Sequence, residues 1–141
     1  MKIKRVEHIA IAVQSLGQSI DFLRDTFGLP LEYEEQIGQT RLAMLPVGQT
    51  YLELLEGQGP ESGVTKWIND KGPGLFHICF EVDDIDGALA ELKAKGVKLR
   101  DETPRIGHGG ARIAFLDPAA TGNVLIELAE LPAGHSPAWG A

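Results

Sequence analysis

Two histidines and two glutamates occupy matching places in the two halves of this 141-residue chain, and their side chains are donors that a divalent metal ion accepts. His8 and His77 each open a six-residue stretch, His-Ile-Ala-Ile-Ala-Val and His-Ile-Cys-Phe-Glu-Val. Glu53 and Glu127 lie in a second pair of similar stretches, Leu-Glu-Leu-Leu and Ile-Glu-Leu-Ala. Imidazole nitrogens and carboxylate oxygens together suit a divalent ion such as zinc, manganese, cobalt or nickel. One such residue in a strand usually has a structural role, so the prediction of a metal site depends on the repetition of all four.

Alternation along the expected strands places these four side chains on equivalent faces. Successive side chains of a strand point to opposite faces, so His8 shares its face with two alanines, and isoleucines and a valine occupy the other. The other three donors fall on the corresponding faces of their own strands. If the two halves pack side by side, we expect the four faces to line one sheet-walled metal cleft. His108 and His135 have no such repeat partners, and we expect both to be loop residues.

The repeat extends to the elements that must carry these residues. Each half continues from its histidine strand into a helical stripe, which Ser15 and Asp84 can cap and which Gly28 and Gly96 can end. The sequence therefore predicts an α+β fold of two tandem βαβββ modules. The expected segments are a first module at 1–56, a linker with a short helix at 57–73, a second module at 74–131 and an irregular tail at 132–141. The expected strands are 5–13, 31–37, 40–47, 50–56, 74–82, 97–101, 111–116 and 123–130.

Composition excludes several classes of function. The formal net charge of −7 argues against a surface that binds nucleic acid or an anionic membrane. Cys79 is the only cysteine, so an intrachain disulfide is impossible and a reducing compartment is expected. No apolar run is long enough to span a membrane, and Glu7 and His8 interrupt any signal-peptide core near the start. We therefore expect a cytoplasmic protein.

Longer stretches of the sequence resemble a known superfamily. The run from 104 to 116, Pro-Arg-Ile-Gly-His-Gly-Gly-Ala-Arg-Ile-Ala-Phe-Leu, continues into Asp117-Pro118 and then Thr-Gly-Asn-Val-Leu-Ile-Glu-Leu over 121–128. Together with the two histidine stretches and Leu-Glu-Leu-Leu-Glu over 52–56, this run resembles the vicinal oxygen chelate superfamily of paired βαβββ modules. Within that superfamily the chain is most similar to the methylmalonyl-CoA epimerases. The resemblance covers about residues 5–131.

This resemblance implies a site and an activity. It maps the metal ligands onto His8, Glu53, His77 and Glu127, and it implies that Glu127 also acts as a catalytic base in the epimerisation of methylmalonyl-CoA. A second base is needed on the other face of the planar intermediate. The family motif of a Glu-Gln ahead of a glycine matches Glu35 best, and Glu34 stays open because a one-residue slip in register exchanges the two faces. The resemblance also implies a divalent metal cofactor, with cobalt the first expectation and manganese, zinc or nickel as alternatives, an acyl-CoA substrate and a homodimer.

Two other functions stay open on the sequence. A glyoxalase I-like lactoylglutathione lyase uses the same four ligand types, and Glu53 suits it, although the first strand ends Ala-Val-Gln without an arginine for a glutathione carboxylate. A non-catalytic small-molecule binding protein of the same fold is the alternative from a different class, and such proteins typically lack the full ligand set.

Overall fold

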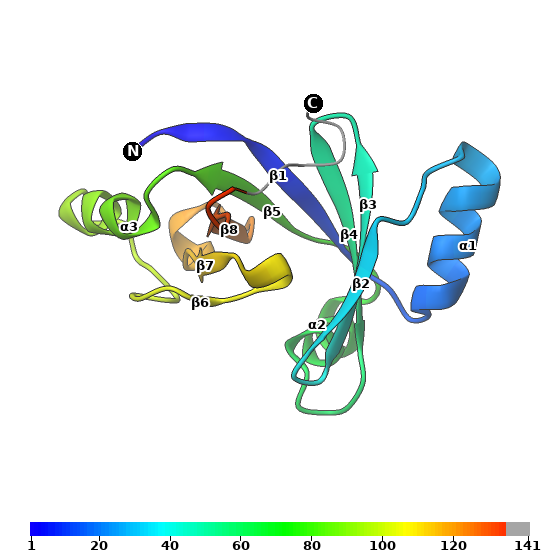
Figure 1. Ribbon diagram of the computed structural model, residues 1–141. Coiled ribbons are helices and arrows are strands. Elements are labelled where there is room, and N and C mark those ends of the chain that lie inside the picture. Colours follow the sequence, from blue (N-terminus) through cyan, green and yellow to red (C-terminus); the bar gives the residue numbers. More distant parts are fainter. Residues whose placement is uncertain (135–141) are drawn as a thin grey trace. The chain divides into compact units, whose positions relative to one another are not determined.

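The computed structural model describes residues 1–134, and within them the predicted α+β fold is confirmed. These residues form eight strands, three α-helices and two short 3₁₀ turns (Figure 1). They divide into two compact units, one of residues 8–76 and the other of residues 1–7 with 77–134. The expected module boundaries, 1–56 and 74–131, were drawn from the sequence repeat and not from contacts between residues, and they remain a prediction. The part of the expected tail at 135–141, with His135, lies outside the described residues.

Residues 8–76 build a four-stranded half-sheet in the order β2-β3-β4-β1. The neighbours β2, β3 and β4 are antiparallel, whereas β1 pairs with β4 in parallel. The strands are β1 (Ile3–Ala12), β2 (Tyr33–Ile37), β3 (Thr40–Val47) and β4 (Thr50–Gly57). A parallel neighbour needs a long crossover connection, which α1 (Leu16–Phe27) and the hairpins supply here.

The helix α1 covers one face of this half-sheet (Figure 1). Its Leu16 and Ile20 pack against Ala43, Leu45 and Leu54 of β3 and β4. The Ser15 hydroxyl accepts a hydrogen bond from the Gln18 amide at 3.2 Å, and Gly28 ends the helix with a φ of 71°. Both predicted boundaries of the first helix are therefore confirmed, because a small polar cap and a left-handed glycine satisfy the terminal backbone groups.

The opposite face of the half-sheet carries its own apolar cluster. Ala10, Ala12, Leu42 and Met44 are buried there, together with Tyr51, Leu55 and Val64. The helix α2 (Gly63–Lys71) contributes Trp67, whose ring packs on Phe76 with the centroids 4.8 Å apart. This face is the one on which the odd-numbered residues of β4 and the even-numbered residues of β1 lie.

The other unit repeats this plan around β5 (Gly74–Val82). Its strand order is β5-β8-β7-β6, with β5 and β8 parallel and the remaining neighbours antiparallel. The strands are β6 (Arg105–Ile106), β7 (Arg112–Phe115) and β8 (Ile126–Glu130). The helix α3 (Ile85–Ala94), capped by Asp84 as predicted, packs its Ile85, Leu89 and Leu92 against Ala114 and Leu128.

The expected strand at 97–101 is wrong. Only Leu99 makes a β-bridge, to Leu116, and the next two-residue strand lies later, at β6. The Asp101 carboxylate accepts a hydrogen bond from the Phe115 amide at 2.9 Å, so a side chain takes the place of a ladder bond at this position. The last strand also begins later than expected, because Gly122 and Asn123 adopt positive φ angles of 63° and 67° that end extended pairing.

No helix within residues 1–134 is long and apolar enough to cross a membrane.

Candidate metal-binding site

The pair formed by His8 and Glu53 lies in the unit of residues 8–76. In the parallel register of β1 and β4, Glu53 lies opposite Ala10, so His8 is two positions earlier and on the same face. The His8 Nε2 lies 3.2 Å from the Glu53 Oε1, and both side chains are buried. Met44 of β3 is the other register neighbour of Glu53. An imidazole and a carboxylate are therefore held together inside an otherwise apolar face.

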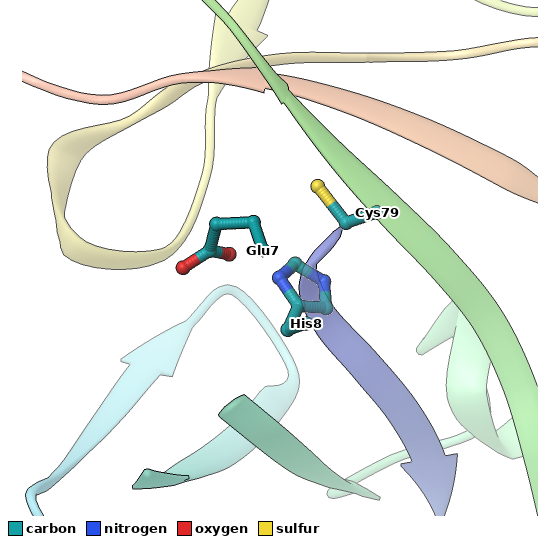
Figure 2. A group of neighbouring side chains, drawn as sticks. All are labelled: Glu7, His8 and Cys79. Carbon is teal, nitrogen blue, oxygen red and sulfur yellow. The ribbon is translucent and has the colours of Figure 1, made fainter. Parts of the chain in front are cut away.

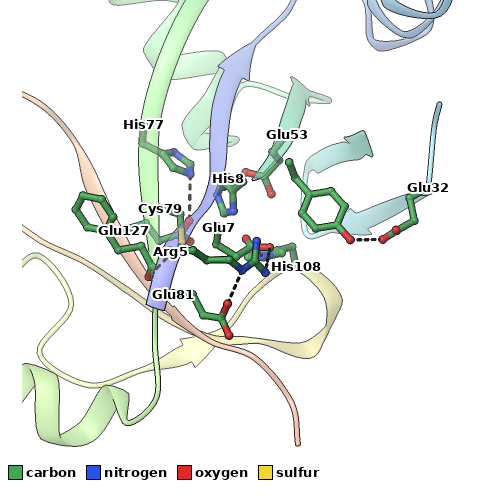
Figure 3. A network of polar contacts seen from close by, with 12 residues as sticks. Arg5, Glu7, His8, Glu32, Glu53, His77, Cys79, Glu81, His108 and Glu127 are labelled. Carbon is green, nitrogen blue, oxygen red and sulfur yellow. Dashed lines mark hydrogen bonds and ion pairs between the residues drawn. The ribbon is translucent and has the colours of Figure 1, made fainter. Parts of the chain in front are cut away.

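The other unit places His77 and Glu127 in the same relation. In the parallel register of β5 and β8, Glu127 lies opposite Cys79, and His77 is two positions earlier on β5. The His77 Nε2 lies 3.1 Å from the Glu127 Oε1, and both side chains are buried (Figure 3). Phe115 of β7 is the other register neighbour of Glu127, and its ring meets the His77 ring edge-on with the centroids 5.0 Å apart.

The two pairs share their geometry and their chemistry. Each consists of a buried histidine and a buried glutamate on parallel neighbouring strands, offset by two positions. Neutral imidazole nitrogens and ionised carboxylate oxygens bind divalent ions. Buried groups of this kind are costly to leave without a compensating charge or hydrogen bond. The described residues therefore hold a buried set of histidine and glutamate donors that suits a divalent metal ion.

The candidates for the second base differ in the face on which they lie. Glu35 is half-buried and shares its face of β2 with Tyr33 and Ile37, which pack against the apolar cluster around Ala10 and Met44. Glu34 points to the opposite face, is exposed, and lies 3.3 Å from the Arg41 guanidinium. Across β3 and β4 the pairing continues in register, so Glu35 lies on the face that carries His8 and Glu53.

His108 lies in the connection between β6 and β7, as expected of a loop residue, but it makes a buried contact that the sequence did not indicate. His108 begins a 3₁₀ turn, is buried, and has its Nε2 2.8 Å from the Glu7 Oε1. Glu7 in turn lies 3.9 Å from the Arg5 guanidinium, which donates to Glu81 at 2.7 Å. Figure 2 shows Glu7 and His8 on β1 and Cys79 on β5.

Two glycines explain why the sequence hides this contact. Gly109 has a φ of 58°, and a Cβ on Gly107 would lie 2.7 Å from the Ile113 side chain, so the loop turns tightly and packs closely on β7. His108 and Glu7 are separated by 101 positions, and no periodicity connects them. The one available signal was Glu7 itself, a carboxylate inside an apolar strand.

The loop before β8 is held by its own polar contacts. The Asp117 Oδ1 accepts a hydrogen bond from the Ala119 amide at 2.9 Å, and this backbone hydrogen bond lowers the pKa of the Asp117 carboxyl. Asp117 therefore serves as the cap of a short turn at Pro118–Ala120.

Comparison with known proteins agrees with this geometry. The family model described as "Glyoxalase/Bleomycin resistance protein/Dioxygenase superfamily" matches residues 5–128. The mitochondrial methylmalonyl-CoA epimerase of Dictyostelium discoideum is 36% identical over 134 residues, covering 91% of this chain and 79% of that protein. The ethylmalonyl-CoA/methylmalonyl-CoA epimerase of Cereibacter sphaeroides is 33% identical over 135 residues, covering 92% of this chain and 99% of that protein.

A solved structure gives the same result for the fold. A variant of the Streptomyces coelicolor methylmalonyl-CoA epimerase, in complex with 2-nitronate-propionyl-CoA, superposes with a TM-score of 0.91 at 35% identity, and the match covers 96% of this chain and all of that one. On the family match, which spans most of its length, the chain belongs to the Glyoxalase/Bleomycin resistance protein/Dioxygenase superfamily.

Proposed function

We propose that this protein is a metal-dependent isomerase that interconverts (2R)- and (2S)-methylmalonyl-CoA. The observation that carries the proposal is the pair of buried histidine–glutamate contacts, His8 with Glu53 and His77 with Glu127, at repeat-equivalent strand positions. The relatives named as epimerases of methylmalonyl-CoA support the choice of substrate. The solved epimerase complex with a CoA ester supports an acyl-CoA ligand.

In this proposal His8, Glu53, His77 and Glu127 hold one divalent ion. Cobalt is the first choice, and manganese, zinc and nickel suit the same donors. The ion, when bound, supplies Lewis-acid stabilisation of the enolate charge, an effect worth several kcal/mol in such sites. The apolar neighbours of each pair, Met44 and Phe115, keep water away from the donors and so strengthen their electrostatic effect.

The protein's own part in the reaction is proton transfer at the α-carbon. One carboxylate removes the α-proton from one face, and the carboxylic acid form of a second residue returns a proton to the opposite face. We assign these roles to Glu127 and Glu35. After one turnover each residue has exchanged its protonation state with the other, so the reverse reaction uses the same pair in the opposite sense.

The position of Glu35 supports its role as the second base. Glu35 pairs with Leu42 on β3, and Leu42 pairs with Leu55 on β4, two positions after Glu53 on the same face. Two strand spacings and two residues along the strand separate the Cα atoms of Glu35 and Glu53 by roughly 12 Å. Glu35 therefore lies on the face that carries the proposed ligand Glu53, whereas Glu34 points to the opposite face.

Further parts of the proposal concern the assembly. We propose that the protein is a homodimer of chains with modules at 1–56 and 74–131, and that it acts in the cytoplasm on a small-molecule substrate. One of the relatives is named as mitochondrial, so fractionation of the source cells is the appropriate test of location. Light scattering during size-exclusion chromatography tests the dimer.

Incubation with (2R)-methylmalonyl-CoA in deuterated water tests the activity. We expect deuterium at the α-carbon together with formation of the (2S) epimer, both lost in the variant His77→Gln. A matched control is His135→Gln, which alters a histidine outside the proposed ligand set. Absence of exchange, with turnover of the methylglyoxal–glutathione adduct, would replace the proposal by a glyoxalase I-like lyase.

Metal analysis of protein purified without chelator separates the enzyme from a non-catalytic binding protein. We expect about one equivalent of a divalent ion per chain, and less than a tenth of that in the double variant His8→Gln/His77→Gln. A wild-type protein that binds no divalent ion on titration with cobalt, manganese, zinc or nickel would contradict the metal-dependent mechanism.

A further inference from the structure

Arg105 lies on the same sheet face as the His77–Glu127 pair. In the antiparallel register of β6 and β7, Arg105 lies opposite Ile113, and directly opposite residues share a face. Ile113 is two positions before Phe115, which lies opposite Glu127. The helix α3 packs on the other face, through Ala114 and Leu128. The topology therefore directs the Arg105 side chain to the side of the sheet that carries the candidate ligands.

Two contacts hold this guanidinium in place. Its central carbon lies 5.5 Å from the centroid of the Phe115 ring, the ring that meets His77 edge-on. Its Nε lies 3.5 Å from the Asp101 Oδ1, and the other Asp101 oxygen accepts a hydrogen bond from the Phe115 amide. Asp101 and Phe115 thus form a fixed cradle for an arginine whose side chain is still 54% exposed. A guanidinium held over an aromatic ring keeps N–H groups available for a further hydrogen bond.

Two other arginines of this unit, Arg112 and Arg5, are already committed to different contacts. Arg112 of β7 lies on the α3 face and donates to Asp86 at 2.8 and 3.0 Å. Arg5 is mostly buried and donates to Glu81 at 2.7 Å. In a chain with a net charge of −7, an anionic substrate needs local positive charge. Arg105 is positioned to supply it beside the His77–Glu127 pair.

We propose that Arg105 binds an anionic oxygen group of the thioester substrate and is a specificity-determining residue. The inference rests on the proposed function, and it adds the group that recognises the substrate's charge. Guanidinium binds carboxylates and phosphates through the same paired hydrogen bonds. The group is therefore either the free carboxylate of the acyl part or a phosphate of the CoA part. Asp101 is a positioning residue in this scheme, because it acts through Arg105.

Steady-state kinetics of Arg105→Gln test the proposal. We expect KM for methylmalonyl-CoA to rise about tenfold with kcat within about twofold of wild type, because an ordinary binding contact contributes equally to ground and transition states. Arg105→Lys should recover part of the lost affinity, since lysine keeps the positive charge but cannot form the paired hydrogen bonds of a guanidinium. The matched control is Arg112→Gln on the opposite face, which should leave KM unchanged. Melting curves of all variants check that each is folded.

A second substrate identifies the anionic group. Methylmalonyl-pantetheine lacks the CoA phosphates, so an equal rise in KM for both substrates assigns Arg105 to the carboxylate, and a rise for the CoA ester alone assigns it to a phosphate. An unchanged KM for both substrates, or a loss confined to kcat, overturns the proposal. Direct titration with methylmalonyl-CoA separates the proposed role of Arg105 in binding from the proposed epimerase activity. A wild type that binds the ester tenfold more tightly than Arg105→Gln but exchanges no deuterium would refute the epimerase activity alone.

Discussion

At the scale of single residues, adjacent glutamates on β2 have opposite environments. Glu34 is exposed and lies against Arg41, whereas Glu35 is half-buried and shares its face with His8 and Glu53. Their chemical identity makes them a matched pair, since the same substitution removes the same charge from two faces of one strand. Only the side chain that faces the substrate can exchange a proton with it.

The substitution Glu35→Gln should therefore separate proton exchange from inversion. We expect epimerisation to fall by about 10²–10⁴-fold, because a positioned acid or base contributes that much. Washout of the α-proton into deuterated water should persist for the epimer whose proton faces Glu127. The control Glu34→Gln should stay within about twofold of wild type. Equal losses in both variants would show that neither glutamate is the second base.

The shared faces of the candidate donors could be predicted because these residues combine a repeat with a period of two. His8, His77, Glu53 and Glu127 each interrupt an apolar strand at the same position, and alternation fixed their faces. The contact between His108 and Glu7 could not be predicted, because it depends on a glycine-rich turn and not on any periodicity. The position of Arg105 could not be predicted either, because it depends on the two-residue strand β6, which is too short to show a pattern in the sequence.

At the scale of elements, the ends of the helices could be predicted from the sequence, whereas the absence of a regular strand at 97–101 could not. Ser15, Gly28 and Asp84 mark helix ends through local hydrogen bonds, so a few residues suffice to identify them. The expected strand at 97–101 was derived from the repeat, in which each helix leads into a strand. In the structure, the Asp101 carboxylate accepts the hydrogen bond of the Phe115 amide that a neighbouring strand would otherwise accept. Tertiary contacts therefore override the local strand preference here.

Gly57, at the end of β4, offers a test of how closely α2 must approach the sheet. A Cβ at this position would lie 2.8 Å from the Thr65 backbone nitrogen and 2.0 Å from its Oγ1. Gly57→Ala should therefore reduce the free energy of unfolding by about 1–3 kcal/mol, as overpacking does. Urea denaturation measures the change.

The control for this prediction is Gly63→Ala in the first turn of α2. No atom lies within 4 Å of a Cβ built there, so we expect unchanged or slightly raised stability. A loss at Gly63 equal to that at Gly57 would mean that the close approach to Thr65 is not the cause.

At the scale of the whole molecule, the proposed metal site predicts that the stability of the fold depends on a bound ion. Each unit buries one histidine and one glutamate at the proposed site. An ion that binds the folded state alone stabilises it by about 2.7 kcal/mol at a hundredfold excess over Kd. Unfolding should then respond to metal as a single linked process.

Chelation followed by calorimetry tests this dependence. Removal of the ion should lower Tm by several degrees, because 1 kcal/mol corresponds to roughly 2–4 °C at this chain length. Cobalt should restore the original Tm in the wild type and have less than a quarter of that effect in His77→Gln. A full restoration in His77→Gln would place the stabilising ion elsewhere.

The strand β1 carries a consequence for how the chain can be divided. The peptide bond between Glu7 and His8 joins the last β1 residue of one unit to the first of the other. A gene fragment that ends at the repeat boundary would leave the second half without the strand segment that bears Arg5 and Glu7, and thus without their contacts to Glu81 and His108. The two sequence repeats therefore do not coincide with the two compact units, because residues 1–7 belong to the first repeat but pack in the unit of residues 77–134.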